Sequence, residues 1–372
     1  MHHRCPPVLS RSLLFTQLSR WHQNNTIIGI PTKFENIGHG AIRTALFNLF
    51  LLGDIAKNKS RDNGGKNYIV LFEEPELFLH PKLTKQLREL IYEVSADDTP
   101  FQVVCASHSP QMIDLTKPKT SIVRMVKSEQ DTHLYQINES LLTDETSHVK
   151  DEIYVALRFN PFMCESFYAD EVILIEGDTE AVLLRGYLQS RPPRKDLFVV
   201  NCGTVNNIPF FQEIFSTFNI TYHVIFDCDE KCVNCSDIDT ITKGIQRTIL
   251  DRYCSDKEKE GYRVGTIHVH HPTLEPAHHK EEIPKELQYP DDCFDENGKF
   301  KGRGKPVKAD TYWKTILEPN LEHEKIDSVP VIAAIKSIIA FDMGGKKLRR
   351  EREELRELVK TDEFVLAQVL MQ

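Results

Sequence analysis

The chain has 372 residues, of which 40% are hydrophobic and 27% are charged, and its net charge is −9. This composition is typical of a folded globular protein, and the length favours two domains of about 100–200 residues each. The acidic balance excludes a global basic field, and no apolar run reaches the roughly 18 residues of a membrane-spanning helix. Nine cysteines in so long a chain favour a reduced compartment over a disulfide framework. We therefore expect a cytoplasmic protein with no membrane contact.

The N-terminal part alternates helical and strand patterns. Apolar residues at helical spacing predict a helix over 41–55, and a polar segment with two glycines predicts a loop over 57–67. Short apolar runs predict buried strands over 68–72 and 101–106, and residues 81–94 between them have helical periodicity. Strand, helix and strand in this order favour a parallel α/β unit.

A second unit of the same kind begins near residue 170. Its predicted elements alternate along the chain as strands over 172–175, 197–200 and 222–226 and helices over 179–189 and 208–218. This order again favours a parallel sheet. Beyond residue 236 the pattern loosens, with a strand over 262–270, an irregular stretch over 284–308 and a charged helix or helix pair over 349–370.

Acidic and imidazole side chains follow both strands of the first unit. In YIVLFEEPELFLHP, Glu73 and Glu74 come directly after the first strand, and in ASHSP His108 follows the second. An acidic pair at that place can hold Mg²⁺ and polarise an attacking water, and an imidazole can contact a γ-phosphate. Gly38 and Gly40 precede the predicted helix, where backbone N–H groups can approach phosphate.

These motifs together resemble the ABC-type ATPase domain of the OLD (overcoming lysogenization defect) family. Residues 36–43 are similar to its signature motif, 68–74 to Walker B with its catalytic glutamate, and 107–109 to its switch histidine. A phosphate loop has the pattern G-x-x-x-x-G-K-[ST], and none of the four Gly-Lys pairs in the chain completes it. The resemblance therefore covers the C-terminal part of an ATPase domain. We expect no ATP hydrolysis by this chain alone, with the phosphate loop supplied by another chain or missing through truncation of the reading frame.

Carboxylates also cluster at strand ends of the second unit. In EVILIEGDTEAVLL, Glu176 follows the first strand and Glu180 lies in the first turn of the next helix, while Asp227 and Asp229 end the third strand. The carboxyl ends of parallel strands line one crevice, so these four groups can reach one point. Four carboxylates there would repel one another unless they shared Mg²⁺ or Mn²⁺. Two such ions can stabilise the attacking and leaving oxygens of phosphodiester cleavage.

This arrangement resembles the Toprim fold, with its E-G-x-x-E, glycine and D-x-D motifs, over about 170–310. Gly203 matches the middle glycine. With the ATPase motifs, the resemblance points to OLD-family nucleases, in which an S-x-E-like segment and a late lysine complete the site. Here Thr273-Leu274-Glu275 is similar to the first, which implies a metal ligand at Glu275. Lys305 in GRGKPVKAD is similar to the second and would neutralise charge in the transition state.

Cysteines and histidines beside these motifs have competing interpretations. Cys228, Cys232 and Cys235 could contribute to a structural zinc site, but only one C-x2-C is present, and free thiols in a loop are the simpler interpretation. One of the histidines near Glu275 could act as a ligand, against four solvated loop histidines; these are His270, His271, His278 and His279. Two basic stretches, 299–308 and 346–352, could be solvated surfaces or contacts for nucleic acid.

The sequence thus predicts an α/β protein with a partial ATPase-like domain over 1–145, a linker over 146–167, a Toprim domain over 168–320 and a helical extension over 321–372. The leading hypothesis is a Mg²⁺- or Mn²⁺-dependent DNA endonuclease, which the family resemblance places in defence against phage or plasmid DNA. It would form a homo-oligomer through the ATPase-like part. One alternative is a non-catalytic subunit that completes an ATP site with a phosphate-loop-containing partner. Another is a topoisomerase- or primase-like Toprim enzyme, which would leave the motifs over 68–110 unexplained.

Overall fold

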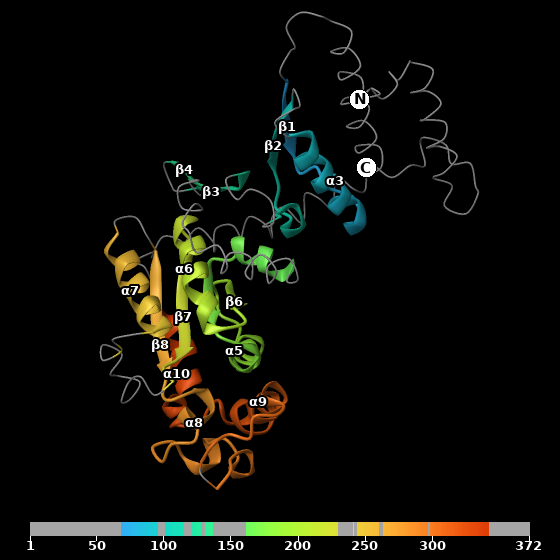
Figure 1. The fold of residues 1–372 in the computed structure, drawn as a ribbon. Helices are drawn as coiled ribbons and strands as arrows, with labels where there is room; N and C mark the ends of the chain where they lie inside the picture. Colours follow the sequence, from blue (N-terminus) through green and yellow to red (C-terminus); the bar gives the residue numbers. More distant parts are fainter. Residues whose placement is uncertain are drawn as a thin grey trace, which may run out of the picture. The chain divides into compact units, whose positions relative to one another are not determined.

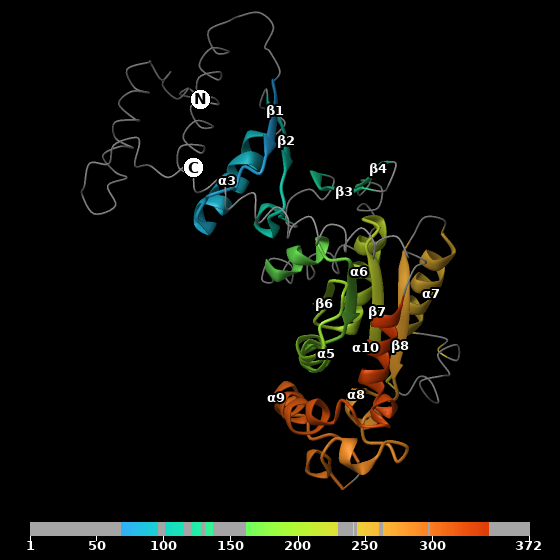
Figure 2. The ribbon, with the colours of Figure 1, turned by 180° about the vertical axis from the view of Figure 1, so that it is seen from behind.

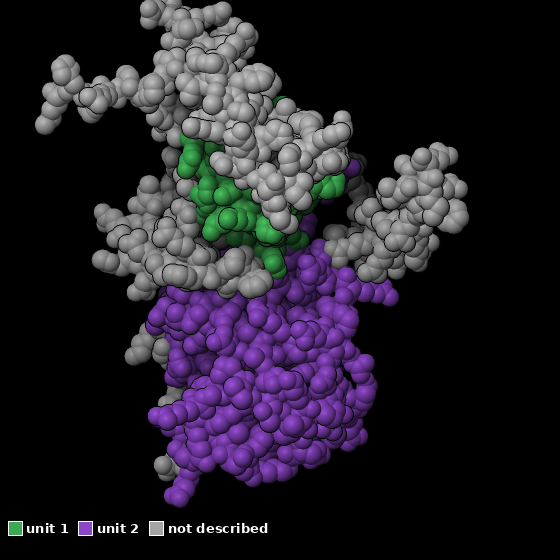
Figure 3. All heavy atoms as spheres, turned by 90° about the vertical axis from the view of Figure 1, so that its right-hand side faces the viewer, with its two compact units in different colours: residues 1–122, 157–168 green, residues 123–156, 169–372 purple. Residues whose placement is uncertain are grey.

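The computed structural model describes residues 68–95, 101–114, 121–127, 131–136, 161–229, 241, 244–259, 263–296 and 298–341. The chain divides into two compact units, one of residues 1–122 with 157–168 and one of 123–156 with 169–372 (Figure 3). Several sequence predictions lie outside the described residues: Gly38, Gly40, Cys232, Cys235, the helices over 41–55 and 349–370, and the basic stretch 346–352.

The first unit contains a parallel strand pair packed on a helix. Its elements are β1 (Tyr68–Glu73), α3 (Pro81–Val94) and β2 (Phe101–Ala106) (Figure 1). The buried side chains of Leu87 and Phe101 join α3 to the strands. Pro81 begins α3, where a proline costs no helical hydrogen bond, and the side chain of His80 accepts from the backbone N–H of Lys82. The predicted strand–helix–strand unit is confirmed.

The second unit is built on a four-stranded parallel sheet in the order β6-β5-β7-β8. Its elements, in chain order, are β3 (Val123–Lys127), β4 (Thr132–Gln136), β5 (Glu171–Ile175), α5 (Asp178–Ser190), β6 (Leu197–Asn201), α6 (Ile208–Thr217), β7 (Thr221–Asp227), α7 (Ile245–Glu258), β8 (Val264–His270), α8 (Leu274–Ala277), α9 (Lys305–Tyr312) and α10 (Pro330–Ala340). The alternating strands and helices predicted over 172–226 are confirmed, and β8 extends the sheet beyond β7.

Helices cover both faces of this sheet. α6 and α7 lie on one face, and α5 and α10 lie on the other (Figures 1 and 2). Side chains of a strand alternate between the two faces of a sheet. Because helices cover both faces here, every interior position of β5 and β7 is buried. Ile173 and Ile175 belong to the core shared with α5, α9 and α10. The sheet is thus buried on both sides, and its strand ends are where polar groups can gather.

Some predicted limits differ from the structure. The hairpin of β3 and β4 groups with the second unit because Arg124 donates to the carbonyls of Phe218 (2.8 Å) and Asn219 (2.9 Å) at the end of α6. α10, which was expected in a separate extension, contributes Ile332 and Ile335 to the core of this unit. The stretch 284–308, which was expected to be irregular, includes the start of α9. Among the described residues, no helix is long and apolar enough to cross a membrane.

Candidate metal centre

Acidic groups meet at the carboxyl edge of the parallel sheet. β5 ends at Ile175, so Glu176 is the first residue beyond it, and Glu180 follows in the first turn of α5. Asp227 is the last residue of β7. It is paired in register with His270, the last residue of β8. Because all four strands run in the same direction, these side chains leave the sheet at the same edge.

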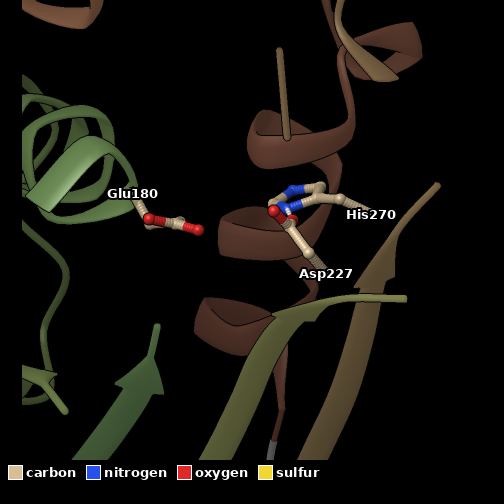
Figure 4. Close-up of side chains that lie close together, drawn as sticks. All are labelled: Glu180, Asp227 and His270. Atoms are coloured by element: carbon tan, nitrogen blue, oxygen red, sulfur yellow. Dashed lines mark ion pairs between the residues drawn. The ribbon is translucent and has the colours of Figure 1, made fainter. Parts of the chain in front are cut away.

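Glu180, Asp227 and His270 form a compact donor cluster (Figure 4). One ligand atom from each side chain lies within 4.8 Å of the other two. Within the cluster, His270 Nδ1 and Asp227 Oδ1 are 3.3 Å apart. Two carboxylates and one imidazole around a single point are a donor set that divalent cations accept in proteins.

Buried atoms that make no hydrogen bond support a cation at this point. Oε2 of Glu176, Oδ1 of Asp227 and Nδ1 of His270 are buried and make no hydrogen bond to the described part of the chain. Leaving such atoms without a partner costs about 1–3 kcal/mol each, so most buried polar atoms in folded proteins are paired. A bound cation would give these lone pairs a partner, so the residues present fit a metal ion.

Burial and mutual repulsion shift the acids toward their protonated forms. Burial, with the charge of Asp227, raises the pKa of Glu180 to about 8. Burial, with the charges of Glu275 and Asp229, raises the pKa of Asp227 to about 8, and the pKa of Glu176 rises to about 7 for the same kind of reason. Burial lowers the pKa of His270 to about 4, so its imidazole is neutral and can act as a ligand at neutral pH.

Glu275 and Lys305 form an ion pair beside this cluster. Glu275 lies in the first turn of α8 and is 2% exposed. Lys305 is the first residue of α9, and its Nζ lies 2.9 Å from Glu275 Oε1. The charge of Lys305 also acts on Glu176 and Asp227, whose pKa values it lowers against the effect of burial. Glu275 and Lys305, which were predicted from short motifs, therefore lie together at the site. The carboxylate of Glu275 is paired with the ammonium group of Lys305.

Asp229 stands apart from the donor cluster. Its φ is +49°, in the left-handed region, and its backbone N–H donates to the carbonyl of Pro272 (2.9 Å). Its side chain is exposed and accepts a hydrogen bond from Gln246 Nε2 (2.9 Å). Its charge still raises the pKa of Glu176 and Asp227, so Asp229 lies near the site without joining the three ligand atoms. Its predicted role as a ligand stays a prediction.

His270 is the residue of the cluster that sequence reasoning left undecided. His270 and His278 are 1% and 0% exposed, so the interpretation of four solvated loop histidines is wrong for these two. His278 donates from Nδ1 to the carbonyl of Leu274 (2.7 Å) and accepts at Nε2 from the backbone N–H of Val331 (3.1 Å). It therefore ties the turn that contains Glu275 to the start of α10. The signal for His270 was its place at a strand end opposite Asp227, which depends on the order of the strands.

The predicted middle glycine lies in the loop after β6. Gly203 has a φ of +79°, which a residue with a Cβ adopts only with strain. Its backbone N–H donates to the side chain of Asn201 (2.8 Å), and this bond holds the turn that leads to α6. The glycine thus serves backbone geometry rather than chemistry.

The motifs of the first unit also meet in space. His108 Nε2 lies 3.4 Å from Glu74 Oε1, and the Glu74 backbone N–H donates to the carbonyl of Ala106 (2.9 Å). Ser107 donates from Oγ to Glu76. His108 is 89% exposed and Glu74 29%, so this pair is open to solvent, as a γ-phosphate would require. Glu73 is exposed at the end of β1. Their ATP-related roles stay predictions.

Of the three cysteines after β7, the structure describes Cys228 only. Its thiol is fully buried, and Sγ lies 3.1 Å from His271 Nδ1. Its side chain is therefore packed beneath the site rather than free in a loop. Whether these cysteines bind zinc stays a prediction.

Comparison with known proteins finds two matching domain families along the chain. A model described as an AAA ATPase domain matches residues 15–113, and one described as "Overcoming lysogenization defect protein-like, TOPRIM domain" matches residues 167–229. The chain carries an OLD-like Toprim domain. Its matched region contains Glu176, Glu180, Asp227 and Asp229 of the predicted motifs.

Relatives of the Toprim-containing chain are nucleases. The OLD nuclease of Thermus scotoductus is 27% identical over 177 residues, which are 45% of this chain and 32% of the relative. The Old nuclease of Escherichia phage P2 is 23% identical over 206 residues, 54% of this chain and 34% of the relative. The endonuclease GajA of Bacillus cereus is 25% identical over 212 residues, 55% of this chain and 32% of the relative. The chain thus spans about a third of the length of each relative.

Proposed function

We propose that this chain is a metal-dependent DNA endonuclease that cuts or nicks the phosphodiester backbone. The observation that carries the proposal is the convergence of Glu180, Asp227 and His270 within 4.8 Å, with buried polar atoms that make no hydrogen bond to the described part of the chain. The OLD-like Toprim match and the nuclease names of the relatives support this assignment. The same resemblance suggests a role in defence against phage or plasmid DNA.

The donor set favours divalent ions of the Mg²⁺ and Mn²⁺ class. Glu180, Asp227 and His270 would hold one ion, and Glu176 and Asp229 would contribute to a second. Bound ions would supply an activated water and stabilise the attacking and leaving oxygens. Mg²⁺ prefers oxygen ligands and a full octahedron, whereas an imidazole is a better ligand for transition metals. We therefore propose that Mn²⁺ binds more tightly than Mg²⁺.

The remaining residues would act on the substrate and on each other. The Nζ group of Lys305 stands beside the carboxylates and can neutralise charge that develops on a phosphoryl oxygen. Glu275 holds that ammonium group in place through the 2.9 Å ion pair. His278 fixes the turn that contains Glu275 to α10. Glu275 and His278 belong to α8 and its C-terminal cap, and Lys305 begins α9, so the packing of these two helices sets the spacing of the three groups.

A plasmid-nicking assay tests the proposal. Supercoiled plasmid is incubated with the whole chain and Mg²⁺ or Mn²⁺, and relaxed and linear products are separated on a gel. We expect conversion that EDTA abolishes and that falls at least 100-fold in Glu180→Gln and Asp227→Asn. Glu282→Gln is the matched control, because Glu282 is an exposed acid of the same unit outside the cluster. Equal nicking by the wild type and Asp227→Asn would refute the assignment of the site.

A further inference from the structure

The loop that delivers Lys305 to the site is strongly basic. Residues 299–308 contain five cations and no acidic residue: Lys299, Lys301, Arg303, Lys305 and Lys308. The loop follows the bridge between Phe294 and Phe300 and ends in α9. It is fixed by backbone bonds, because Lys299 N–H donates to Asp295 Oδ1 and Lys301 N–H donates to the carbonyl of Cys293.

Three of the five cations have partners within the chain. Lys305 pairs with Glu275 (2.9 Å). Lys301 donates from Nζ to the carbonyl of Asp292 (2.9 Å), and Lys308 donates from Nζ to the carbonyl of Lys301 (2.8 Å). Lys308 also lies 4.7 Å from the centre of the buried Phe300 ring. Lys301 and Lys308 therefore stabilise the loop, and Lys305 belongs to the site.

The other two cations, Lys299 and Arg303, face solvent. Both are exposed, and their side chains make no hydrogen bond or ion pair to the residues that the structure describes. Of the acids before the loop, Asp291 pairs with Lys285, and Asp295 accepts the backbone N–H of Lys299. Within the described part of the chain, Lys299 and Arg303 are thus two exposed positive charges without an ion-pair partner on a fixed loop.

Their position relative to the site follows from chain geometry. Arg303 is two residues before Lys305, so its Cα lies within about 7.6 Å of the Lys305 Cα. The flanking residues are Gly302 and Gly304, and a Cβ built on either meets nothing within 4 Å. The loop around Arg303 is therefore open on both sides, and a polymer can approach its guanidinium group beside the site.

We propose that Lys299 and Arg303 bind the DNA phosphates next to the one that is cut. The inference rests on the proposed nuclease function and names how its substrate is held. A guanidinium group can bind a phosphate through two parallel hydrogen bonds, and a lysine acts as a point charge on a flexible stem. Such contacts carry no sequence information, so the loop positions the strand without selecting its sequence.

Binding of duplex DNA at several salt concentrations tests this. The probe is a fluorescein-labelled 30-base-pair duplex, measured by anisotropy with Ca²⁺ in place of Mg²⁺ or Mn²⁺. Each phosphate contact contributes about 0.9 to the slope of log affinity against log salt. For the double variant Lys299→Gln/Arg303→Gln we expect the slope to fall by about 1.8. Its affinity deficit should then shrink about 12-fold between 50 and 200 mM salt.

Two matched variants accompany the double variant. Lys257→Gln/Lys325→Gln removes two exposed cations of the same unit outside the loop and should leave the slope unchanged. Lys299→Arg/Arg303→Lys keeps both charges and should have the wild-type slope.

The outcomes separate the loop assignment from the nuclease function. If the wild type nicks plasmid and the double variant Lys299→Gln/Arg303→Gln has the wild-type slope, the loop assignment is refuted and the nuclease function is not. If the slope falls by about 1.8 in the double variant but the wild type never nicks plasmid, the loop assignment is supported and the nuclease function is refuted. Absence of duplex binding by the wild type overturns the loop assignment.

Discussion

At the scale of single residues, the acids of the site depend on a cation for their charge. Burial and neighbouring carboxylates raise the pKa of both Glu180 and Asp227 to about 8. A folded chain without a cation therefore keeps protons that the unfolded chain releases near the ordinary carboxyl pKa of about 4. The site thereby couples stability to pH and to metal.

This coupling predicts an unusual pH dependence of stability. A carboxyl whose folded pKa is raised contributes stability below its unfolded pKa and loses it as pH rises through the folded pKa. In EDTA we expect Tm to fall from pH 5 to pH 9 through these two groups, and Mn²⁺ to raise it most above pH 7. Scanning calorimetry measures this. In Asp227→Asn the fall should be smaller, and equal pH profiles for the two chains would contradict the prediction.

His270 should discriminate between metals. Its neutral imidazole offers a nitrogen that Mn²⁺ accepts more readily than Mg²⁺ does. We expect His270→Ala to weaken Mn²⁺ binding at least tenfold in titration calorimetry and to weaken Mg²⁺ binding less. His323→Gln is the control, since His323 lies 3.3 Å from Glu286 and outside the cluster. Equal losses for both ions would assign His270 to packing.

Among the helices and strands, local sequence patterns predict single elements, but they do not predict which elements lie side by side. α3 begins and ends where its apolar periodicity and Pro81 predict, and β7 is the buried, mostly apolar strand that the sequence predicts over 222–226. His270 could not be assigned in the same way, because its partnership with Asp227 requires that β8 lie beside β7. The hairpin of β3 and β4 likewise joins the second unit through Arg124, which contacts residues more than 90 positions away. No local sequence pattern predicts the pairing of His270 with Asp227 or the contact of the hairpin with the end of α6.

A glycine in β8 depends on such a neighbour. A Cβ on Gly265 would lie 2.4 Å from the ring of His223, which is fully buried and held by Glu171 (2.9 Å) and Thr266 (3.0 Å). The ring cannot move aside without losing these partners. We expect Gly265→Ala to destabilise the fold by about 1–3 kcal/mol in urea unfolding. Gly302→Ala meets nothing within 4 Å and should change stability little, and equal effects of the two would argue against the clash.

At the scale of the whole molecule, the ATPase-like unit has its Glu74 and His108 together, while the sequence contains no phosphate loop. We predict that this chain alone releases no phosphate from ATP above background, and that Glu74→Gln makes no difference. A malachite-green assay over hours measures this. Release that Glu74→Gln abolishes would mean that another segment of this chain cradles the phosphates.

The proposed function requires that a divalent cation bind at the carboxyl edge of the sheet. Diffraction from Mn²⁺-soaked crystals at the manganese absorption edge tests it most directly, because anomalous density locates the ion without reference to activity. We expect a peak within about 2.5 Å of oxygens of Glu180 and Asp227 and of Nδ1 of His270. A fully soaked crystal with no peak at these three residues, or with a peak elsewhere only, would contradict it.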